Sequence, residues 1–141
     1  MIAPGAAAVL DRGLRVQEAM HESPFDFSAQ TIVAVPTDLP VPLGEHSRAF
    51  DAALAGVVED LARLSDGGLF VLFTSYRSLR SVAQLLRARG TEKRWPLFVQ
   101  GEMPRSQLLR EFTRSGRAVL LGVASFWEGV DVPGDPLRGL V

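Results

Sequence analysis

Residues 69–77, Leu-Phe-Val-Leu-Phe-Thr-Ser-Tyr-Arg, decide the fold of this 141-residue chain. Five consecutive apolar residues without polar alternation are typical of a strand that is buried on both faces of a sheet. Thr74 and Ser75 follow as good helix N-caps, and apolar residues then recur at helical spacing over 78–89, with Gly90 as the stop. The stretch therefore predicts a buried strand that leads directly into an amphipathic helix.

Strand and helix patterns alternate on both sides of this stretch. They predict helices over 45–64 and 105–114, and strands over 31–35, 97–99, 118–123 and from 138 onward. The polar face predicted for the first of these helices carries Arg48, Asp51, Glu59 and Asp60. This order is typical of an α/β fold with a parallel sheet and right-handed crossovers. Because the last run stops within an element, we expect the chain to be a fragment.

The composition excludes several classes of protein. The formal charge is −1, and 47% of the residues are hydrophobic, which suits one globular domain. The sequence has no cysteine, so it contains no disulfide, thiolate zinc site or iron–sulfur ligand, and His21 and His46 are too few for a histidine-rich metal centre. No apolar run approaches the roughly 18 residues that span a bilayer. No basic stretch precedes the Ala-rich start, so we expect a cytoplasmic protein without membrane contact.

The near-zero net charge hides a strong segregation of charge along the chain. Residues 1–66 carry 4 basic and 10 acidic side chains, whereas residues 67–117 carry 10 basic and 3 acidic ones. Of the 15 cationic residues, 14 are arginine, which binds phosphate in a bidentate manner. The segregation indicates an anionic partner, although solvated helix faces would give the same pattern.

Three polar segments follow predicted strands, at residues 74–77, 100–102 and 124–134. In open parallel sheets the carboxyl ends of the strands share one edge, where ligands bind. The first segment sets two hydroxyls and Arg77 at a helix start, which suits either an anion site or simple capping. In the third, Phe126 and Trp127 can stack on a base or pack under the loop.

The remaining residues of the third segment add acceptors and a flexible position. Glu128 and Asp131 can accept a ribose hydroxyl, an arginine or a metal-bound water, or can simply be solvated. Gly129 permits close approach of the backbone. The sequence has no Gly-x-x-x-x-Gly-Lys-Ser/Thr, Gly-x-Gly-x-x-Gly, Gly-x-Ser-x-Gly or His-Glu-x-x-His run, so no catalytic set is complete in this chain.

Two of these segments resemble motifs of a known enzyme family. Residues 69–76 resemble motif IV, and residues 122–134 resemble motif V, of the DinG/YoaA-type helicases, the bacterial relatives of XPD in superfamily 2. Supporting matches are Ser23-Pro24-Phe25-Asp26-Phe27, Asp38-Leu39-Pro40, Gln100-Gly101, Leu108-Leu109 and Phe112. The resemblance covers roughly Ser23 to Val141.

The resemblance implies part of an ATP-dependent DNA helicase that unwinds 5′ to 3′ in DNA repair. It implies a lead-in segment over 1–22 and, over 23–141, a partial second RecA-like motor domain with motifs IV and V but without motif VI. ATP and Mg²⁺ would bind through an upstream motor domain, which in longer relatives also holds an iron–sulfur cluster. We expect the isolated chain to be inactive as an ATPase.

The resemblance also implies roles for individual residues. Those expected to bind single-stranded DNA are Thr74, Ser75, Tyr76, Arg77, Gln100, Ser125, Phe126, Trp127 and Glu128. Those expected at the ATP cleft are Gly129 and Asp131. Two other hypotheses remain open on the residues alone. One is a non-enzymatic interaction or regulatory module that presents Phe126 and Trp127 to a protein, and the other is a flavodoxin-like ligand binder.

Overall fold

The computed structural model describes residues 19–41, 47–123, 126, 128 and 130–141. The chain divides into two units, residues 1–35 and residues 36–141. In the described part of the first unit, the only helix is the single turn α1 (Phe27–Gln30), where the Asp26 carboxylate accepts from the Ala29 N–H at 3.2 Å. None of the described residues of this unit is buried.

The strand predicted over 31–35 is not present. These residues have no strand partner, and Ile32 and Val33 are 95% and 84% exposed. The prediction was wrong because β-branched residues favour a strand only when a neighbouring strand supplies hydrogen bonds and packing.

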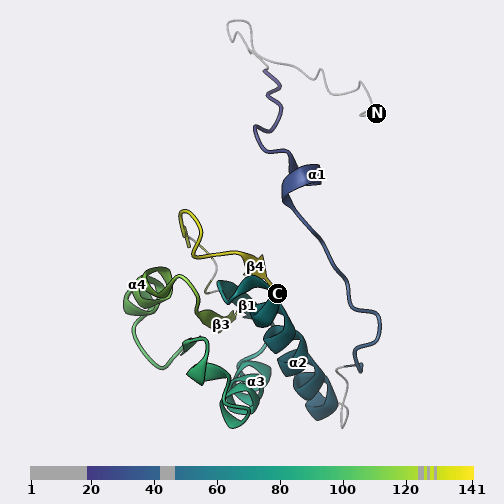
Figure 1. The fold of residues 1–141 in the computed structure, drawn as a ribbon, viewed down its shortest axis with the longest axis vertical. Coiled ribbons are helices and arrows are strands. Elements are labelled where there is room, and N and C mark those ends of the chain that lie inside the picture. Colours follow the sequence, from purple (N-terminus) through teal and green to yellow (C-terminus); the bar gives the residue numbers. More distant parts are fainter. Residues whose placement is uncertain (1–18, 42–46, 124–125, 127, 129) are drawn as a thin grey trace, which may run out of the picture. The chain divides into compact units, whose positions relative to one another are not determined.

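The second unit is built on a parallel four-stranded sheet in the order β2-β3-β1-β4 (Figure 1). Its strands are β1 (Leu69–Phe73), β2 (Leu97–Val99), β3 (Val119–Val123) and β4 (Gly139–Leu140). β3 is central, pairing along its whole length with β1 and through its first three residues with β2. The predicted strands 69–73, 97–99 and 118–123 are confirmed, and β4 confirms the strand that opens near residue 138.

The helices cover both faces of this sheet. They are α2 (Ser47–Ser65), α3 (Tyr76–Ala88) and α4 (Arg105–Ser115), with the 3-10 turn η2 (Thr91–Lys93) after α3. Alternate residues of β1 divide the core, since Leu69, Val71 and Phe73 pack with α2 and α3, whereas Phe70 packs with α4. Figure 1 shows α4 on the opposite side of the sheet from α2 and α3. The α/β parallel fold is therefore confirmed.

The boundaries of α3 differ slightly from the prediction. The helix begins at Tyr76, two residues early, because the Ser75 side chain accepts from the Ser78 N–H at 3.2 Å and acts as the N-cap. Of the two hydroxyls that could cap the helix, Ser75 is the one that does so. Consequently Tyr76 and Arg77 lie in the first helical turn, directly after the end of β1.

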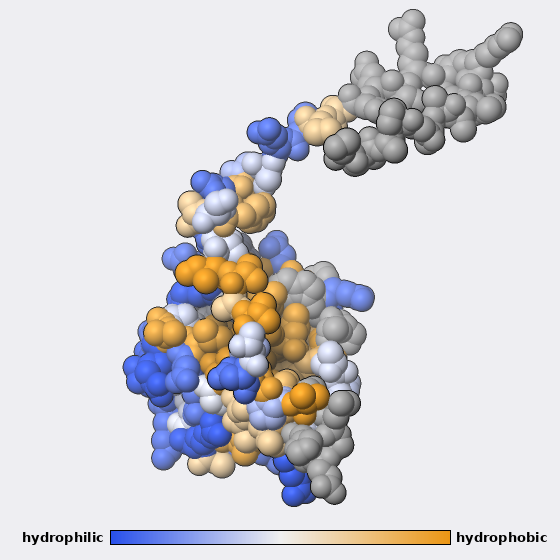
Figure 2. Space-filling model, turned by 90° about the vertical axis from the view of Figure 1, so that its right-hand side faces the viewer, coloured by the Kyte–Doolittle hydropathy of each residue, from blue (hydrophilic) through white to orange (hydrophobic). Residues whose placement is uncertain are grey.

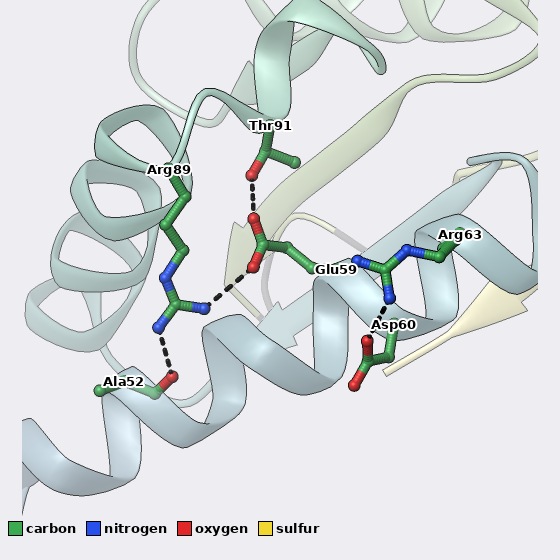
Figure 3. Close-up of polar contacts among 6 residues, drawn as sticks. All are labelled: Ala52, Glu59, Asp60, Arg63, Arg89 and Thr91. Atoms are coloured by element: carbon green, nitrogen blue, oxygen red, sulfur yellow. Dashed lines mark hydrogen bonds and ion pairs between the residues drawn. The ribbon is translucent and has the colours of Figure 1, made fainter.

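A polar cluster joins α2 to the end of α3 (Figure 3). The Glu59 carboxylate accepts from the Thr91 hydroxyl at 2.5 Å and from Arg89 at 3.0 Å, and Arg89 also donates to the Ala52 carbonyl at 3.1 Å. Because Thr91 is buried, its hydroxyl needs this partner. The contacts fix α3 against α2 at the end away from Tyr76. Among the described residues, no helix is both long and apolar enough to cross a membrane.

Candidate nucleic-acid interface

Three strands end at one edge of the sheet, which we call the carboxyl edge. The parallel register brings the ends of β1 and β3 side by side, with Phe73 opposite Val123. Val99 at the end of β2 lies opposite Leu121 on the other side of β3. The segments that follow β1, β2 and β3 therefore start from the same edge, as the sequence predicts.

The side chain of Gln100 links these three strand ends. Its Nε2 donates to the Tyr76 hydroxyl at 2.9 Å, and its Oε1 accepts from the Val123 N–H at 2.7 Å. The Gln100 backbone N–H also donates to the Leu121 carbonyl at 2.9 Å. One amide thus holds the residue after β2, the first residue of α3 and the last residue of β3 together.

The start of α3 presents exposed polar groups beside this link. Thr74, Ser75, Tyr76 and Arg77 are all exposed, and Tyr76 has 47% of its surface open to solvent. Two hydroxyls, a phenol and a guanidinium at a helix N-terminus form a surface on which an anion can accept hydrogen bonds.

Arg77 stands over a buried carboxylate. Asp51 of α2 is 1% exposed, and its Oδ1 accepts from the Ser78 hydroxyl at 2.5 Å. Its Oδ2 makes no hydrogen bond and lies 3.5 Å from Arg77 Nη1. Asp51, which helical spacing places on the polar face of α2, is therefore buried, because the first turn of α3 covers this carboxylate. The Arg77 side chain stays 61% exposed, so it can meet a second anion.

The segment after β3 divides between the core and the surface. Phe126 is 3% exposed and packs edge-to-face on Phe70, with 5.9 Å between the ring centroids. Of the two possibilities weighed for this ring, packing is the one that the structure has. Glu128 and Asp131 are exposed. The predicted site residues Ser125, Trp127 and Gly129 lie outside the described residues.

A hollow of about 250 Å³ adjoins Gln100, between α3 and the turn after β2. Arg80, Gln84, Arg87 and Glu102 contribute to its lining. Glu102 holds Arg87 through two hydrogen bonds of 2.7 Å, and these bonds raise the pKa of the Arg87 guanidinium above its usual range. Arg80 makes no ion pair with any described residue, so its charge is open to a ligand.

Arg80 and Asp51 are the members of this site that sequence reasoning missed. Arg80 follows Tyr76 by four residues and therefore lies on the same side of α3, a signal that helical spacing could have supplied. No local pattern marks Asp51, because its burial depends on contact with another helix.

Comparison with known proteins identifies relatives of this chain. A family model described as "Helicase C-terminal domain" matches residues 58–141. The ATP-dependent DNA helicase YoaA of Escherichia coli is 38% identical over 123 residues, which are 87% of this chain and 18% of that protein. A protein of Bacillus subtilis named 3′-5′ exonuclease DinG is 34% identical over 118 residues, 82% of this chain and 13% of that protein. The ATP-dependent helicase DinG of Mycobacterium tuberculosis is 33% identical over 115 residues, 82% of this chain and 17% of its own length.

The chain thus spans less than a fifth of the length of these relatives, whereas the family model covers more than half of the chain. The matched residues include α3, α4, all four strands and the carboxyl edge. The motifs that resembled the DinG/YoaA type lie within the same region. The chain belongs to the helicase C-terminal domain family, in its DinG/YoaA-type branch.

Proposed function

We propose that this chain supplies the single-stranded DNA track and one wall of the ATP cleft of an ATP-dependent DNA helicase. The observation that carries the proposal is the Gln100 link, which brings the ends of three parallel strands into one surface. Beside that link lie exposed hydroxyls and two arginines on one helix start. The name of the E. coli relative supports DNA as the partner, and the names of the E. coli and M. tuberculosis relatives both support ATP as the fuel.

The chemistry of the carboxyl edge suits binding without sequence preference. The Tyr76 ring offers a face on which a base can stack, and Thr74 and Ser75 can donate to phosphate oxygens. Arg77 and Arg80 add positive charge along α3. Gln100 keeps Tyr76 in place, so the stacking surface and the hydroxyls keep a constant spacing.

The segment after β3 would connect this track to the nucleotide. We assign Ser125, Trp127 and Glu128 to the groove between DNA and cleft, and give Phe126 the role of an anchor because its ring is buried. Gly129 and Asp131 belong to the ATP cleft in this proposal. Asp131 is exposed, and a carboxylate there can accept a ribose hydroxyl. Mg²⁺ would enter with the nucleotide phosphates.

The proposal also includes the organisation of the whole protein. Residues 23–141 would form part of the second RecA-like motor domain, preceded by a lead-in segment over 1–22. The sequence holds neither a Walker A run nor cysteine, so an upstream motor domain would supply the phosphate cradle and any iron–sulfur cluster. Unwinding from 5′ to 3′, a role in DNA repair and a cytoplasmic location complete the proposal.

Binding of a labelled oligo(dT) strand to this chain, followed by fluorescence anisotropy over a salt series, tests the DNA track. We expect the Kd to rise with salt concentration, because phosphate contacts release counterions. Arg77→Glu should weaken binding about tenfold, since it replaces an attraction to phosphate by a repulsion.

Arg63→Glu is the matched control for that variant. The Arg63 side chain is also 61% exposed and also pairs with one aspartate, but it lies in the last turn of α2, directly before the start of β1. It should change the Kd less than about twofold. Binding that ignores salt, or equal effects of the two variants, would contradict the proposed track.

A further inference from the structure

Arg105, the first residue of α4, forms hydrogen bonds with the backbone that follows β3. Its Nη2 donates to the Phe126 carbonyl at 3.2 Å and also to the Glu128 carbonyl. Its guanidinium carbon lies 5.5 Å from the centroid of the Phe126 ring. Two backbone acceptors and one aromatic ring, all at or next to the same turn, thus converge on a single arginine.

Two side chains contact the Phe126 ring. Phe70 of β1 meets it edge-to-face, and Arg105 covers it from α4, so the ring is 3% exposed. Gly122 leaves the room for this arrangement, since a Cβ there would lie 3.3 Å from the Phe126 side chain and 3.1 Å from Phe70. Val130 and Val132 also pack against this part of the core. The buried ring is therefore a fixed point beside the Arg105 guanidinium.

We propose that Arg105 is a positioning residue that fixes the directions of the Phe126 and Glu128 carbonyls, and through them the positions of the Glu128 and Asp131 side chains. A guanidinium that donates to two carbonyls two residues apart restricts both peptide groups, because each charge-assisted hydrogen bond fixes one carbonyl direction. Glu128 and Asp131 are both exposed, so these contacts would decide where their carboxylates meet solvent. The part of this inference that concerns DNA rests on the proposed function, whereas the part that concerns the backbone does not.

Arg105 could also act as a direct phosphate contact, because the side chain is exposed and its contacts with these two carbonyls involve only Nη2. The two roles give different results. A phosphate contact contributes to the number of counterions released, and its loss reduces the salt slope of binding by about 0.7 for a single strand. A positioning residue changes the affinity at every salt concentration and leaves the slope unchanged.

Nitrogen-15 relaxation of the 141-residue chain tests the effect on the backbone without DNA. Arg105→Met keeps the length of the side chain and removes its donors, so the order parameters of the Glu128 and Asp131 amides should fall. Arg105→Lys keeps a charged donor and should recover most of the order. Arg110→Met is the control, because Arg110 is exposed on the same helix and makes no ion pair with a described residue.

Three results of the relaxation experiment would overturn the inference. They are unchanged order parameters in Arg105→Met, an equal loss in Arg110→Met, and an equal loss in Arg105→Met and Arg105→Lys. Because Arg105 is exposed, the amide spectrum of β1 and β3 should remain that of the parent chain, which shows that the fold is intact.

Binding of oligo(dT) over a salt series tests the consequence for DNA. Arg105→Met should raise the Kd about threefold or more at each salt concentration with an unchanged slope, and Arg110→Met should raise it less. A slope reduced by about 0.7 would identify a phosphate contact and overturn the positioning role. If the parent chain fails to bind oligo(dT), the proposed track fails, and the relaxation experiment still decides the role of Arg105.

Discussion

The two edges of the sheet use their charged residues in opposite ways. At the amino edge, where the strands begin, Asp66 accepts from Arg117 at 2.8 Å and from the Trp95 indole at 3.2 Å, and its carbonyl accepts from Arg138 at 2.8 Å. These residues precede β1, β3, β2 and β4, so one turn connects the starts of all four strands.

The carboxyl edge leaves comparable groups open to solvent. Arg77 makes one ion pair of 3.5 Å, Arg80 makes none with a described residue, and Thr74 is exposed. Figure 2 shows one face of the molecule, where hydrophilic side chains gather at the left and hydrophobic ones lie in the middle. The difference indicates that Arg117 and Arg138 at the amino edge stabilise the fold, whereas Arg77 and Arg80 at the carboxyl edge keep exposed charge that a ligand can meet.

The largest expected effect comes from adding a side chain to Gly67, which lies in the turn at the amino edge. Gly67 has a φ of +78°, and a Cβ there would lie 1.9 Å from the Arg117 carbonyl oxygen. Gly67→Ala should therefore lower the free energy of unfolding by about 3 kcal/mol or more, measured by urea denaturation. Gly101→Ala at the carboxyl edge is the comparison, since Gly101 also has positive φ but no atom within 4 Å of the added Cβ. It should cost about 1 kcal/mol, and equal losses would remove the contrast.

A smaller effect is expected from breaking the link at the carboxyl edge. Gln100→Ala leaves the Val123 N–H without its acceptor and frees Tyr76, so oligo(dT) affinity should fall about fivefold to tenfold. Gln107→Ala on the exposed side of α4 serves as the control and should change the affinity little. An affinity that stays at the parent value in Gln100→Ala would show that the link has no part in binding.

A third variant should strengthen binding. Asp51→Asn removes the negative charge beneath Arg77 and keeps an oxygen for the Ser78 hydroxyl, so more of the Arg77 charge is available to phosphate. We expect an oligo(dT) Kd about twofold to threefold lower at low salt. The gain should vanish when Arg77→Gln is added to Asp51→Asn. A gain that persists in the double variant would show that Arg77 is not its source.

The smallest effect is expected on the surface of α2. Asp60 and Arg63 form an exposed pair at 2.8 Å, whereas the neighbouring Glu59 joins α2 to Arg89 and the buried Thr91 (Figure 3). Asp60→Ala should change the free energy of unfolding by less than about 0.5 kcal/mol. Glu59→Ala should lower it by about 1–3 kcal/mol, because it removes the partner of a buried hydroxyl. Urea denaturation measures both losses. A larger loss of stability in Asp60→Ala than in Glu59→Ala would contradict this prediction.

The local sequence pattern was sufficient to predict the helices and strands that bury a continuous apolar surface. The run over 69–73 and the spacing of α2, α3 and α4 predicted their type and their place to within two residues. The same reasoning failed at 31–35, where strand formation depends on a partner that sequence spacing does not contain. It also gave no sign that Asp51 is buried, because the burial of a polar residue is decided by the helix that packs over it.

For the candidate site, the sequence predicted which segments share one edge of the sheet but not which side chains contact one another there. Parallel strands require Tyr76, Gln100 and the end of β3 to share one edge, and the structure has Tyr76, Gln100 and Val123 together there. The Gln100 amide bonds to both Tyr76 and Val123, and Arg105 bonds to the Phe126 carbonyl. These contacts depend on side-chain directions in three dimensions. Residue type alone permits these contacts but does not select them.

The cluster around Asp66 has a consequence for how this scaffold can change over time. Because one turn secures the origins of all four strands, the exposed positions at the far end, such as Thr74 and Arg77, are not needed to hold the sheet together. Substitutions at those positions can accumulate, or be introduced from a relative, and change which ligand binds without unfolding the domain. A sheet that is stabilised at its amino edge and tolerates substitution at its carboxyl edge is well suited to evolving new ligand specificities.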